Sequence, residues 1–282
     1  MREVLSGGKA IDWNDKTGDG HAMMTIDWSP VAHLGPIPIN WYGLTWALGF
    51  LIGGAIVRRD STRYGIKPDH VDTAVLWIAV GTMLGARLYY VVQNDFGEYV
   101  QQPWRILAFW DGGLAFFGGL FGGILAAWMY ARKAAIPFGR LADLFAPAVP
   151  IGSAIGRISC FLDGMDYGTP TRLPWGVVYT NLNSYAPNDG VPRHPDQVYE
   201  LIGDLFIAAL LFKVRGRFRD GSLFLLYLIL FSVLRFFLFF VRGNVPVVAF
   251  GLKNGQLTAL AILVVAIPMF VRVRVFQRET TV

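Results

Sequence analysis

The feature that most constrains the fold is a series of long apolar segments with very few charged residues. A helix needs about 20 mostly apolar residues to cross the roughly 30 Å hydrocarbon core of a bilayer. Seven segments approach this length, and they lie at residues 40–57, 73–92, 112–130, 144–162, 198–212, 222–241 and 256–271. We therefore predict an all-α integral membrane protein with about seven transmembrane helices.

The composition supports this class and excludes several others. Only 16% of the residues are charged and 54% are hydrophobic, whereas soluble chains carry about 25% charged residues. The net charge of +5 indicates no nucleic-acid partner, because basic residues also gather in membrane-flanking loops. A single cysteine, Cys160, excludes intramolecular disulfides, multi-cysteine zinc sites and iron–sulfur clusters. We expect neither a metal nor a cofactor.

The distribution of basic residues predicts the orientation in the membrane. Of the 25 Lys and Arg residues, 14 lie in the loops after the first, third and fifth segments and in the C-terminal tail, against 7 on the opposite side. The positive-inside rule then places the N-terminus outside and the C-terminus in the cytoplasm. We divide the chain into a polar extracytoplasmic segment (1–34), a transmembrane domain (35–275) and a cytoplasmic tail (276–282). Within the domain, the proline-rich loop 163–197 is predicted to form a small extracytoplasmic cap.

Two arginines inside the apolar segments indicate an anionic ligand. An arginine at the centre of a membrane helix costs about 2.5–3.5 kcal/mol on insertion scales, so Arg157 and Arg235 must face a polar cavity, a counter-charge or a lipid head group. A guanidinium group can hold a phosphate through two parallel hydrogen bonds. The alternative is that both arginines pair with Glu200 and Asp204, and that Arg87 extends its charge to the interface.

Three other polar or small-residue patterns allow ordinary structural roles. Glycines one turn apart, such as Gly118 with Gly122, favour close packing of the third segment against another helix. Asp163 and Asp166 lie near the outer surface, where a carboxylate could act as a base or be solvated. His194 precedes a proline, and a single histidine in that setting is more often a structural hydrogen-bond partner than a catalyst.

Short motifs follow one another in a fixed order from about Leu34 to Val271. They are Gly35-Pro36 with Trp41-Tyr42-Gly43-Leu44; Gly85-Ala86-Arg87-Leu88 with Tyr90; Trp110-Asp111-Gly112-Gly113; Gly156-Arg157-Ile158 with Phe161, Gly164 and Gly168; Arg193-His194-Pro195 with Gln197, Tyr199 and Glu200; and Arg235-Phe236 with Phe240 and Arg242. This ordered set resembles the bacterial prolipoprotein diacylglyceryl transferases. Members of that family transfer the diacylglyceryl group of phosphatidylglycerol to the lipobox cysteine thiol of a secreted prolipoprotein and release glycerol phosphate.

The resemblance implies a multi-pass enzyme of the bacterial cytoplasmic membrane, with phosphatidylglycerol and a prolipoprotein as its partners. Arg157 and Arg235 match the family's essential arginines, and they are expected to hold the lipid phosphate and stabilise the charge on the departing phosphate. Tyr42 matches a tyrosine implicated in the site, and Asp163 is a candidate proton acceptor. The expected lipid-binding set also includes Gly164, Gly168, Arg87, His194 and Glu200.

Several positions depart from the family pattern. The histidine proposed as the base for the thiol is Phe117 here, and a glutamate and a tyrosine of the sixth segment are Phe239 and Phe231. The family's Gly-Asn reads Ser159-Cys160, and its Asn-Gly-Glu reads Asp163-Gly164-Met165.

A thiol with an unperturbed pKa of about 8.5 still needs help to ionise, and we expect the field of the two arginines or Asp163 to provide it. Cys160 is expected to be an inert small hydrophobe rather than a resident nucleophile. Two other interpretations remain open. One is an altered or inactive relative that binds or presents anionic phospholipid, and the other is a small transporter.

Overall fold

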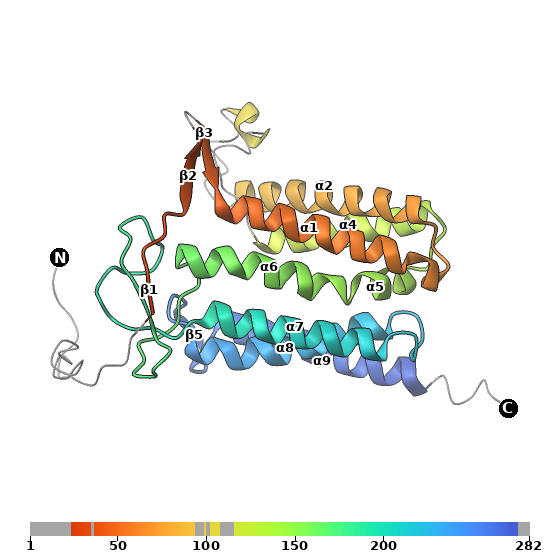
Figure 1. The fold of residues 1–282 in the computed structure, drawn as a ribbon. Helices are drawn as coiled ribbons and strands as arrows, with labels where there is room; N and C mark the ends of the chain where they lie inside the picture. Colours follow the sequence, from red (N-terminus) through yellow and green to blue (C-terminus); the bar gives the residue numbers. More distant parts are fainter. Residues whose placement is uncertain (1–23, 35–36, 94–98, 100–101, 108–115, 276–282) are drawn as a thin grey trace.

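The computed structural model describes residues 24–34, 37–93, 99, 102–107 and 116–275. Helices make up most of this part of the chain (Figure 1). The helices are α1 (Trp41–Asp60), α2 (Pro68–Gln93), α4 (Phe116–Lys133), α5 (Phe138–Phe145), α6 (Ala148–Asp163), α7 (Asp196–Val214), α8 (Ser222–Val241) and α9 (Asn254–Val275), with short 3-10 helices η2 (Ser61–Tyr64) and η3 (Pro103–Leu107). The strands are β1 (Met24–Ile26), β2 (Val31–Leu34), β3 (Ile37–Asn40), β4 (Val177–Tyr179), β5 (Val247–Ala249) and β6 (Leu252–Lys253).

Each of the seven apolar segments overlaps one long helix, which confirms the mostly helical, membrane-type fold. Within the described part of the chain, three helical stretches are long and apolar enough to cross a bilayer, namely Pro68–Val92, Ser222–Val241 and Asn254–Val273. A fourth is added if α5 and α6, which meet at a bend of 41°, count as one span. The number of seven spans stays a prediction.

The bend between α5 and α6 interrupts the fourth apolar segment, where the sequence predicted one continuous helix. Pro147 stands at the break and Pro150 in the first turn of α6. Because proline lacks an N–H and its ring clashes with the preceding turn, it ends a helix and is tolerated only near the start of the next one.

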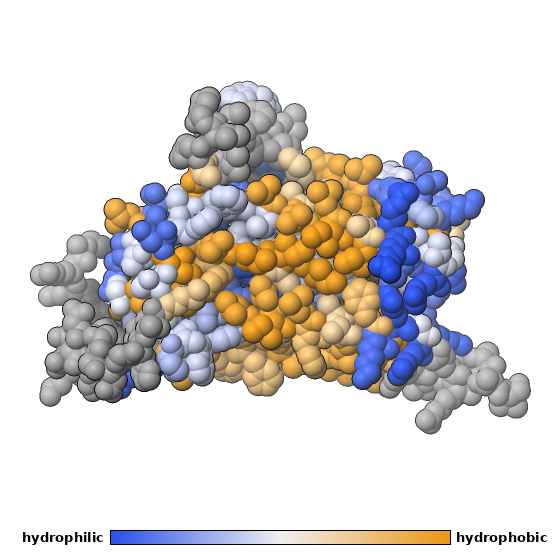
Figure 2. Space-filling view, viewed as in Figure 1, coloured by the Kyte–Doolittle hydropathy of each residue, from blue (hydrophilic) through white to orange (hydrophobic). Residues whose placement is uncertain are grey.

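Figure 2 shows a broad hydrophobic band across the middle of the molecule. Large apolar side chains such as Leu51, Val92 and Val264 are exposed within the helices that form it. Hydrophilic residues gather at the end of the bundle where the C-terminus lies (Figures 1 and 2). Basic residues occupy the last turns of the helices that finish there, including Arg58, Arg59, Arg132, Lys133 and Lys213.

Glycines allow α2 and α4 to pack very closely, as the sequence predicted. A Cβ atom added to Gly122 would collide with the backbone of Gly81 and Gly85, and one added to Gly85 would collide with Gly118. Only residues without a side chain permit such an approach of two helix backbones.

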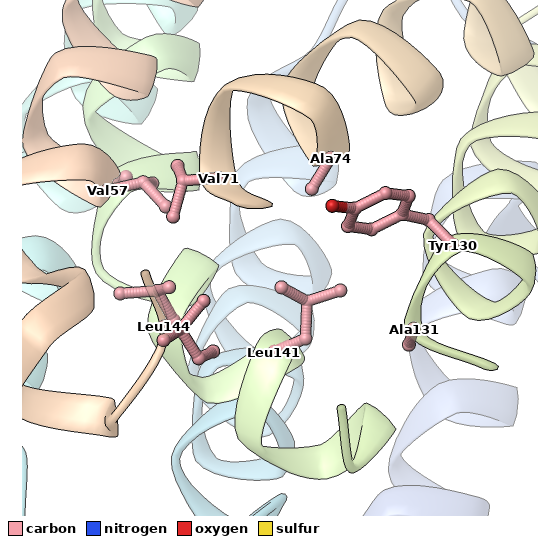
Figure 3. Close-up of a cluster of buried hydrophobic side chains, with 9 residues drawn as sticks. Val57, Val71, Ala74, Tyr130, Ala131, Leu141 and Leu144 are labelled. Atoms are coloured by element: carbon pink, nitrogen blue, oxygen red, sulfur yellow. The ribbon is translucent and has the colours of Figure 1, made fainter. Parts of the chain in front are cut away.

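A buried apolar cluster joins α1, α2, α4 and α5 near the basic end of the bundle (Figure 3). Val57, Val71, Leu141 and Leu144 point into it, and the Tyr130 ring borders it. This cluster fixes the helix ends opposite to the polar residues of the candidate site.

The predicted cap region is an ordered unit at the other end of the helices. β1 pairs in parallel with β4, so that Thr25 lies opposite Val178. Ile26, Val177, Tyr179 and Ala186 form a small core there. The loop 163–197 is therefore packed against the segment that precedes α1, and its extracytoplasmic position stays a prediction.

Candidate functional site

Three arginines converge on the buried carboxylate of Glu200. Glu200 Oε1 lies 2.9 Å from Arg157 Nη2 and 2.6 Å from Arg235 Nη1, and Glu200 Oε2 lies 2.8 Å from Arg242 Nη2. Arg157 comes from α6, Glu200 from α7, and Arg235 and Arg242 from α8 and its C-terminal cap. In Figure 1, α6 lies between α1 and α7, and α8 lies beside α7 with α9 packed on α8. Pairing with Glu200 and Asp204 was the alternative to phosphate binding. Both arginines do pair with Glu200, whereas no salt bridge joins either of them to Asp204 in the described chain.

Two aspartates complete the site. Asp166 Oδ2 lies 2.7 Å from Arg157 Nη1 and 3.3 Å from Arg242 Nη1, and Arg242 Nε donates to Asp196 Oδ2 at 2.7 Å. The three arginines, Glu200, Asp166 and Asp196 are called the arginine–carboxylate cluster below. Three positive and three negative charges balance in it, which explains how an apolar bundle tolerates them. Buried charges persist only when they are paired and hydrogen-bonded.

The position of the cluster follows from the helix ends. Arg157 lies six residues before the end of α6, and Arg235 lies seven residues before Arg242. With a rise of about 1.5 Å per residue, both guanidinium groups start from backbone about 10 Å inside the bundle. The cluster therefore lies one to two turns below the cap, at a depth that suits a lipid head group.

After α6 ends, two residues in the left-handed conformation turn the chain back, so that Asp166 lies next to Arg157. Gly164 (φ 75°) and Asp166 (φ 60°) both adopt positive φ, a conformation that glycine and aspartate tolerate best. Burial opposes ionisation of the Asp166 carboxyl, but the charges of Arg242 and Arg157 outweigh it and hold its pKa below the ordinary value.

Gly168 joins three segments at the edge of the cluster. Its N–H donates to the carbonyl of His194 at 3.1 Å, and it forms an isolated bridge with Arg242. A Cβ at this position would collide with the His194 backbone. Gly164 is similarly tight, since a Cβ there would collide with Ser184 Oγ. In the described chain both predicted lipid-site glycines are packed against the protein's own loops.

Tyr42 lies in the first turn of α1, on the side that faces α6. Its backbone N–H donates to Asn40 Oδ1 at 2.9 Å, which caps the helix. Its ring centroid lies 5.9 Å from that of Trp46, and the Trp46 indole packs on Gly156, the residue before Arg157. One turn further along α1, Thr45 Oγ1 donates to Ser159 Oγ at 2.7 Å. The structure thus brings the predicted Tyr42 close to Arg157.

Asp163 is buried at the last position of α6. Its backbone carbonyl accepts from Tyr185 N–H and from Ser184 Oγ. Neither of its carboxylate oxygens has a hydrogen-bond partner among the residues that the structure describes. A buried carboxyl in this state is costly and therefore a functional candidate.

His194 and Arg87 make contacts outside the cluster. His194 Nδ1 lies 3.2 Å from Tyr199 Oη, which also accepts from Trp175 Nε1 at 2.7 Å, and burial lowers the pKa of His194. Arg87 Nε donates to the Ile106 carbonyl at 3.0 Å. The contact of His194 with Tyr199 matches the structural hydrogen-bond role that is common for a single histidine.

Some predicted features fall outside the described residues. They are Gly35-Pro36, the motif Trp110-Asp111-Gly112-Gly113, the tail 276–282, most of the N-terminal segment and the side chain of Phe117.

Comparison with known proteins identifies the family. The family model for prolipoprotein diacylglyceryl transferase matches residues 30–272. The chain belongs to the prolipoprotein diacylglyceryl transferase family. It is 38% identical over 255 residues to the phosphatidylglycerol–prolipoprotein diacylglyceryl transferase of Nitratidesulfovibrio vulgaris (strain DSM 19637 / Miyazaki F), covering 87% of this chain and 94% of the relative.

Two further relatives carry the same name and a similar extent of likeness. The protein of Geobacter sulfurreducens is 34% identical over 247 residues, covering 85% of this chain and 93% of its own. That of Chromohalobacter salexigens is 35% identical over 253 residues, covering 87% and 92%. The similarity to these transferases therefore includes every helix of the arginine–carboxylate cluster.

Sequence reasoning did not assign three members of the cluster in this prolipoprotein diacylglyceryl transferase relative to the arginine site. Arg242 was counted among the loop charges that set topology, although it also closes the Arg235-Phe236 motif. Asp166 was considered only as an outer carboxylate that is a base or is solvated, and Asp196 was given no part in the site. Helical spacing could have found two of them, because Arg242 follows Arg235 by seven residues and Asp196 precedes Glu200 by four, which places each pair on one helix face. Asp166 gives no such signal, since it reaches Arg157 through an irregular turn.

Proposed function

We propose that the chain transfers the diacylglyceryl group of phosphatidylglycerol to the cysteine thiol of a prolipoprotein. The observation that carries the proposal is the arginine–carboxylate cluster, a set of buried guanidinium groups near one end of an apolar bundle. Family membership and the names of the relatives supply the reaction.

The lipid phosphate binds Arg157 and Arg235 beside Glu200. Both arginines reach the same oxygen, Glu200 Oε1, so their guanidinium groups lie close enough for one phosphate to bridge them as well. Arginine suits this role because its planar N–H groups match two phosphate oxygens. Tyr42, beside Arg157, is positioned to orient the glycerol backbone.

The chemical step forms one bond and breaks another. The cysteine sulfur of the prolipoprotein bonds to the diacylglycerol carbon that carries the phosphate ester, while the carbon–oxygen bond breaks and glycerol phosphate leaves with the electron pair. The phosphate gains one negative charge as a diester becomes a monoester. Arg157 and Arg235 stabilise that charge, which preorganised cationic donors do well in a dry site.

The thiol proton must be accepted within the site. Position 117 carries phenylalanine, which cannot accept a proton. Asp163 is the proposed acceptor, because its carboxylate is buried and its oxygens lack hydrogen-bond partners in the described chain. The positive field of the arginines favours the thiolate in addition.

The proposed location is the bacterial cytoplasmic membrane, with seven spans, the N-terminus and the cap 163–197 outside, and the C-terminus in the cytoplasm. The basic helix ends at Arg58, Arg132 and Lys213 support this orientation. Phosphatidylglycerol and the lipobox cysteine then meet at the outer leaflet, and Gly164, Gly168, Arg87, His194 and Glu200 surround or support the lipid site.

One assay tests the proposal. The purified protein is incubated in phosphatidylglycerol vesicles with a lipobox peptide, and the diacylglyceryl adduct is measured by mass spectrometry. We expect an adduct on the cysteine peptide and none on a serine peptide. Arg157→Ala and Arg235→Ala should each lower turnover by about 100-fold or more.

Matched controls separate chemistry from folding. Arg140→Ala removes an arginine paired with Asp220 at the opposite end of the bundle, and Cys160→Ala removes the only cysteine; both should keep turnover. No adduct, from a protein that still binds phosphatidylglycerol, would replace the transferase proposal with that of a lipid-binding relative.

A further inference from the structure

The ring of Phe239 lies between the two arginines of α8. The Arg235 guanidinium carbon is 4.8 Å from the ring centroid and that of Arg242 is 4.9 Å from it. Phe239 is only 5% exposed. Because positions 235, 239 and 242 share one helix face, the ring and both cations lie on the side of α8 that contacts Glu200.

A ring and a carboxylate use different parts of a guanidinium group. The negative face of an aromatic ring attracts the flat face of the cation, whereas a carboxylate takes the N–H donors at its edge. Glu200 already accepts from the edges of Arg235 and Arg242. A second carboxylate in place of Phe239 would occupy more of these donors and repel a phosphate. The ring attracts both cations and takes none of their N–H donors. Arg242 already uses Nε, Nη1 and Nη2 on Asp196, Asp166 and Glu200, whereas of the Arg235 nitrogens only Nη1 has a hydrogen-bond partner in the described chain.

The Phe239 ring packs tightly against the start of α9. A Cβ added to Gly255 would overlap three carbons of the Phe239 ring, so the ring packs directly on the backbone of the second residue of α9. Gln256 Nε2 donates to the Phe236 carbonyl at 3.2 Å and holds this end of α9 against α8. The ring therefore has little freedom to move away from the arginines.

We propose that Phe239 is a positioning residue that holds Arg235 and Arg242 through their flat faces, so that Arg242 stays on its carboxylates and the remaining N–H donors of Arg235 are directed at the phosphate of the lipid substrate. Gly255 is also required for this arrangement, because a side chain at position 255 would occupy the space of the Phe239 ring. The inference deepens the proposed function and rests on it.

The test varies the charge distribution of the ring at nearly constant size. Phenylalanine derivatives with one, two and three fluorine atoms are incorporated at position 239, and the Kd for dihexanoyl phosphatidylglycerol is measured by calorimetry beside the turnover of a lipobox peptide. Fluorine weakens the negative face step by step. We expect the Kd to rise along the series by about 2- to 30-fold in all, the range that one cation–π contact spans.

Two controls isolate the electrostatic effect. Cyclohexylalanine at position 239 has a similar shape but no aromatic face, so it should weaken lipid binding at least as much as the trifluoro ring does. The same fluorine series at Phe240, which is 56% exposed on α8, should leave the Kd unchanged. A Kd at position 239 that does not follow fluorination, or a cyclohexylalanine variant that binds the lipid as tightly as the native protein, would overturn the inference.

Gly255→Ala offers an independent route to the same ring. We expect it to weaken lipid binding in the native background and to have little added effect beside Phe239→Leu, because the two changes act on one contact. Equal effects in both backgrounds would contradict the pairing. A fluorine-dependent Kd in a protein that transfers nothing would refute the proposed function while leaving the arginine-positioning role intact.

Discussion

At the scale of single residues, the site depends on one carboxylate that three cations share. Glu200 is fully buried and is bonded to Arg157, Arg235 and Arg242. Removing one partner from a buried ion pair leaves an uncompensated charge, which is far more costly than losing a surface pair. Without the Glu200 carboxylate, the arginines would carry excess positive charge, and an anionic lipid would neutralise it.

Glu200→Gln should therefore destabilise the protein and strengthen its response to lipid. We expect a loss of about 3 kcal/mol in the free energy of unfolding, partly restored by phosphatidylglycerol and less by phosphatidylcholine. Thermal unfolding in detergent, with and without each lipid, measures both effects. Asp189→Asn is the matched control, because Asp189 pairs with Arg193 at the surface with 42% of its side chain exposed and should cost about 1 kcal/mol or less. Equal losses in the two variants would argue against a central role for Glu200.

Asp166 gives the site a defined dependence on pH. Since Arg242 and Arg157 lower its pKa below 3.8, the folded state binds its proton less readily than the unfolded state does. Its contribution to stability is therefore complete above the ordinary pKa and is lost as the pH falls through the folded value. We expect Asp166→Asn to cost about 1 kcal/mol at pH 7 and progressively less below about pH 4, as measured by unfolding midpoints from pH 3 to 7. A gap between variant and native protein that is constant over this range would contradict the assignment.

At the scale of elements, the pair of α2 and α4 illustrates how glycine spacing becomes a helix contact. Gly122 leaves room for Gly81 and Gly85 to approach. The spacing of Gly118 and Gly122 predicted that this helix packs closely against another. It did not predict that the partner is α2, because nothing in the sequence shows which helices are neighbours in space.

Gly122→Ala should be far more harmful than an alanine in an open helix position. The new methyl group collides with the backbone of α2, and overpacking costs about 1–3 kcal/mol. Gly43→Ala is the control, because nothing lies within 4 Å of a Cβ there; the exchange should be neutral or stabilise α1 by up to about 1 kcal/mol. Thermal unfolding of both variants tests the packing, and similar midpoints would contradict it.

The helices of the bundle could be predicted from the sequence, whereas the break between α5 and α6 and the contacts between helices could not. Apolar length located all seven long helices, because a membrane helix satisfies its own backbone. It did not foresee the break at Pro147, since proline can either kink a membrane helix or end it. Arg157, Arg235 and Glu200 stood out as charges in apolar surroundings, whereas Asp166 and Asp196 adjoin loops, where an acidic residue is unremarkable.

At the scale of the whole molecule, the two ends of the bundle differ in charge and in function. One end carries the basic last turns of α1, α4 and α7, and the other carries the packed loop 163–197 above the arginine–carboxylate cluster. A lipid donor in the outer leaflet and a secreted protein acceptor can meet only if the cluster end faces outward. The positive-inside rule gives the same orientation from independent residues.

Single cysteines placed in the loops test this orientation and the number of spans together. The native Cys160 is buried, so a membrane-impermeant maleimide should leave it unlabelled in intact cells. Leu182→Cys, at a position 88% exposed in the predicted cap, and Phe250→Cys, at one 96% exposed between β5 and β6, should be labelled from outside. Lys67→Cys and Arg217→Cys, both exposed at the basic end, should react only after permeabilisation. If α7 and α8 did not both cross the membrane, Leu182→Cys, Arg217→Cys and Phe250→Cys would lose this alternating pattern, and the cluster could not receive both substrates from one side.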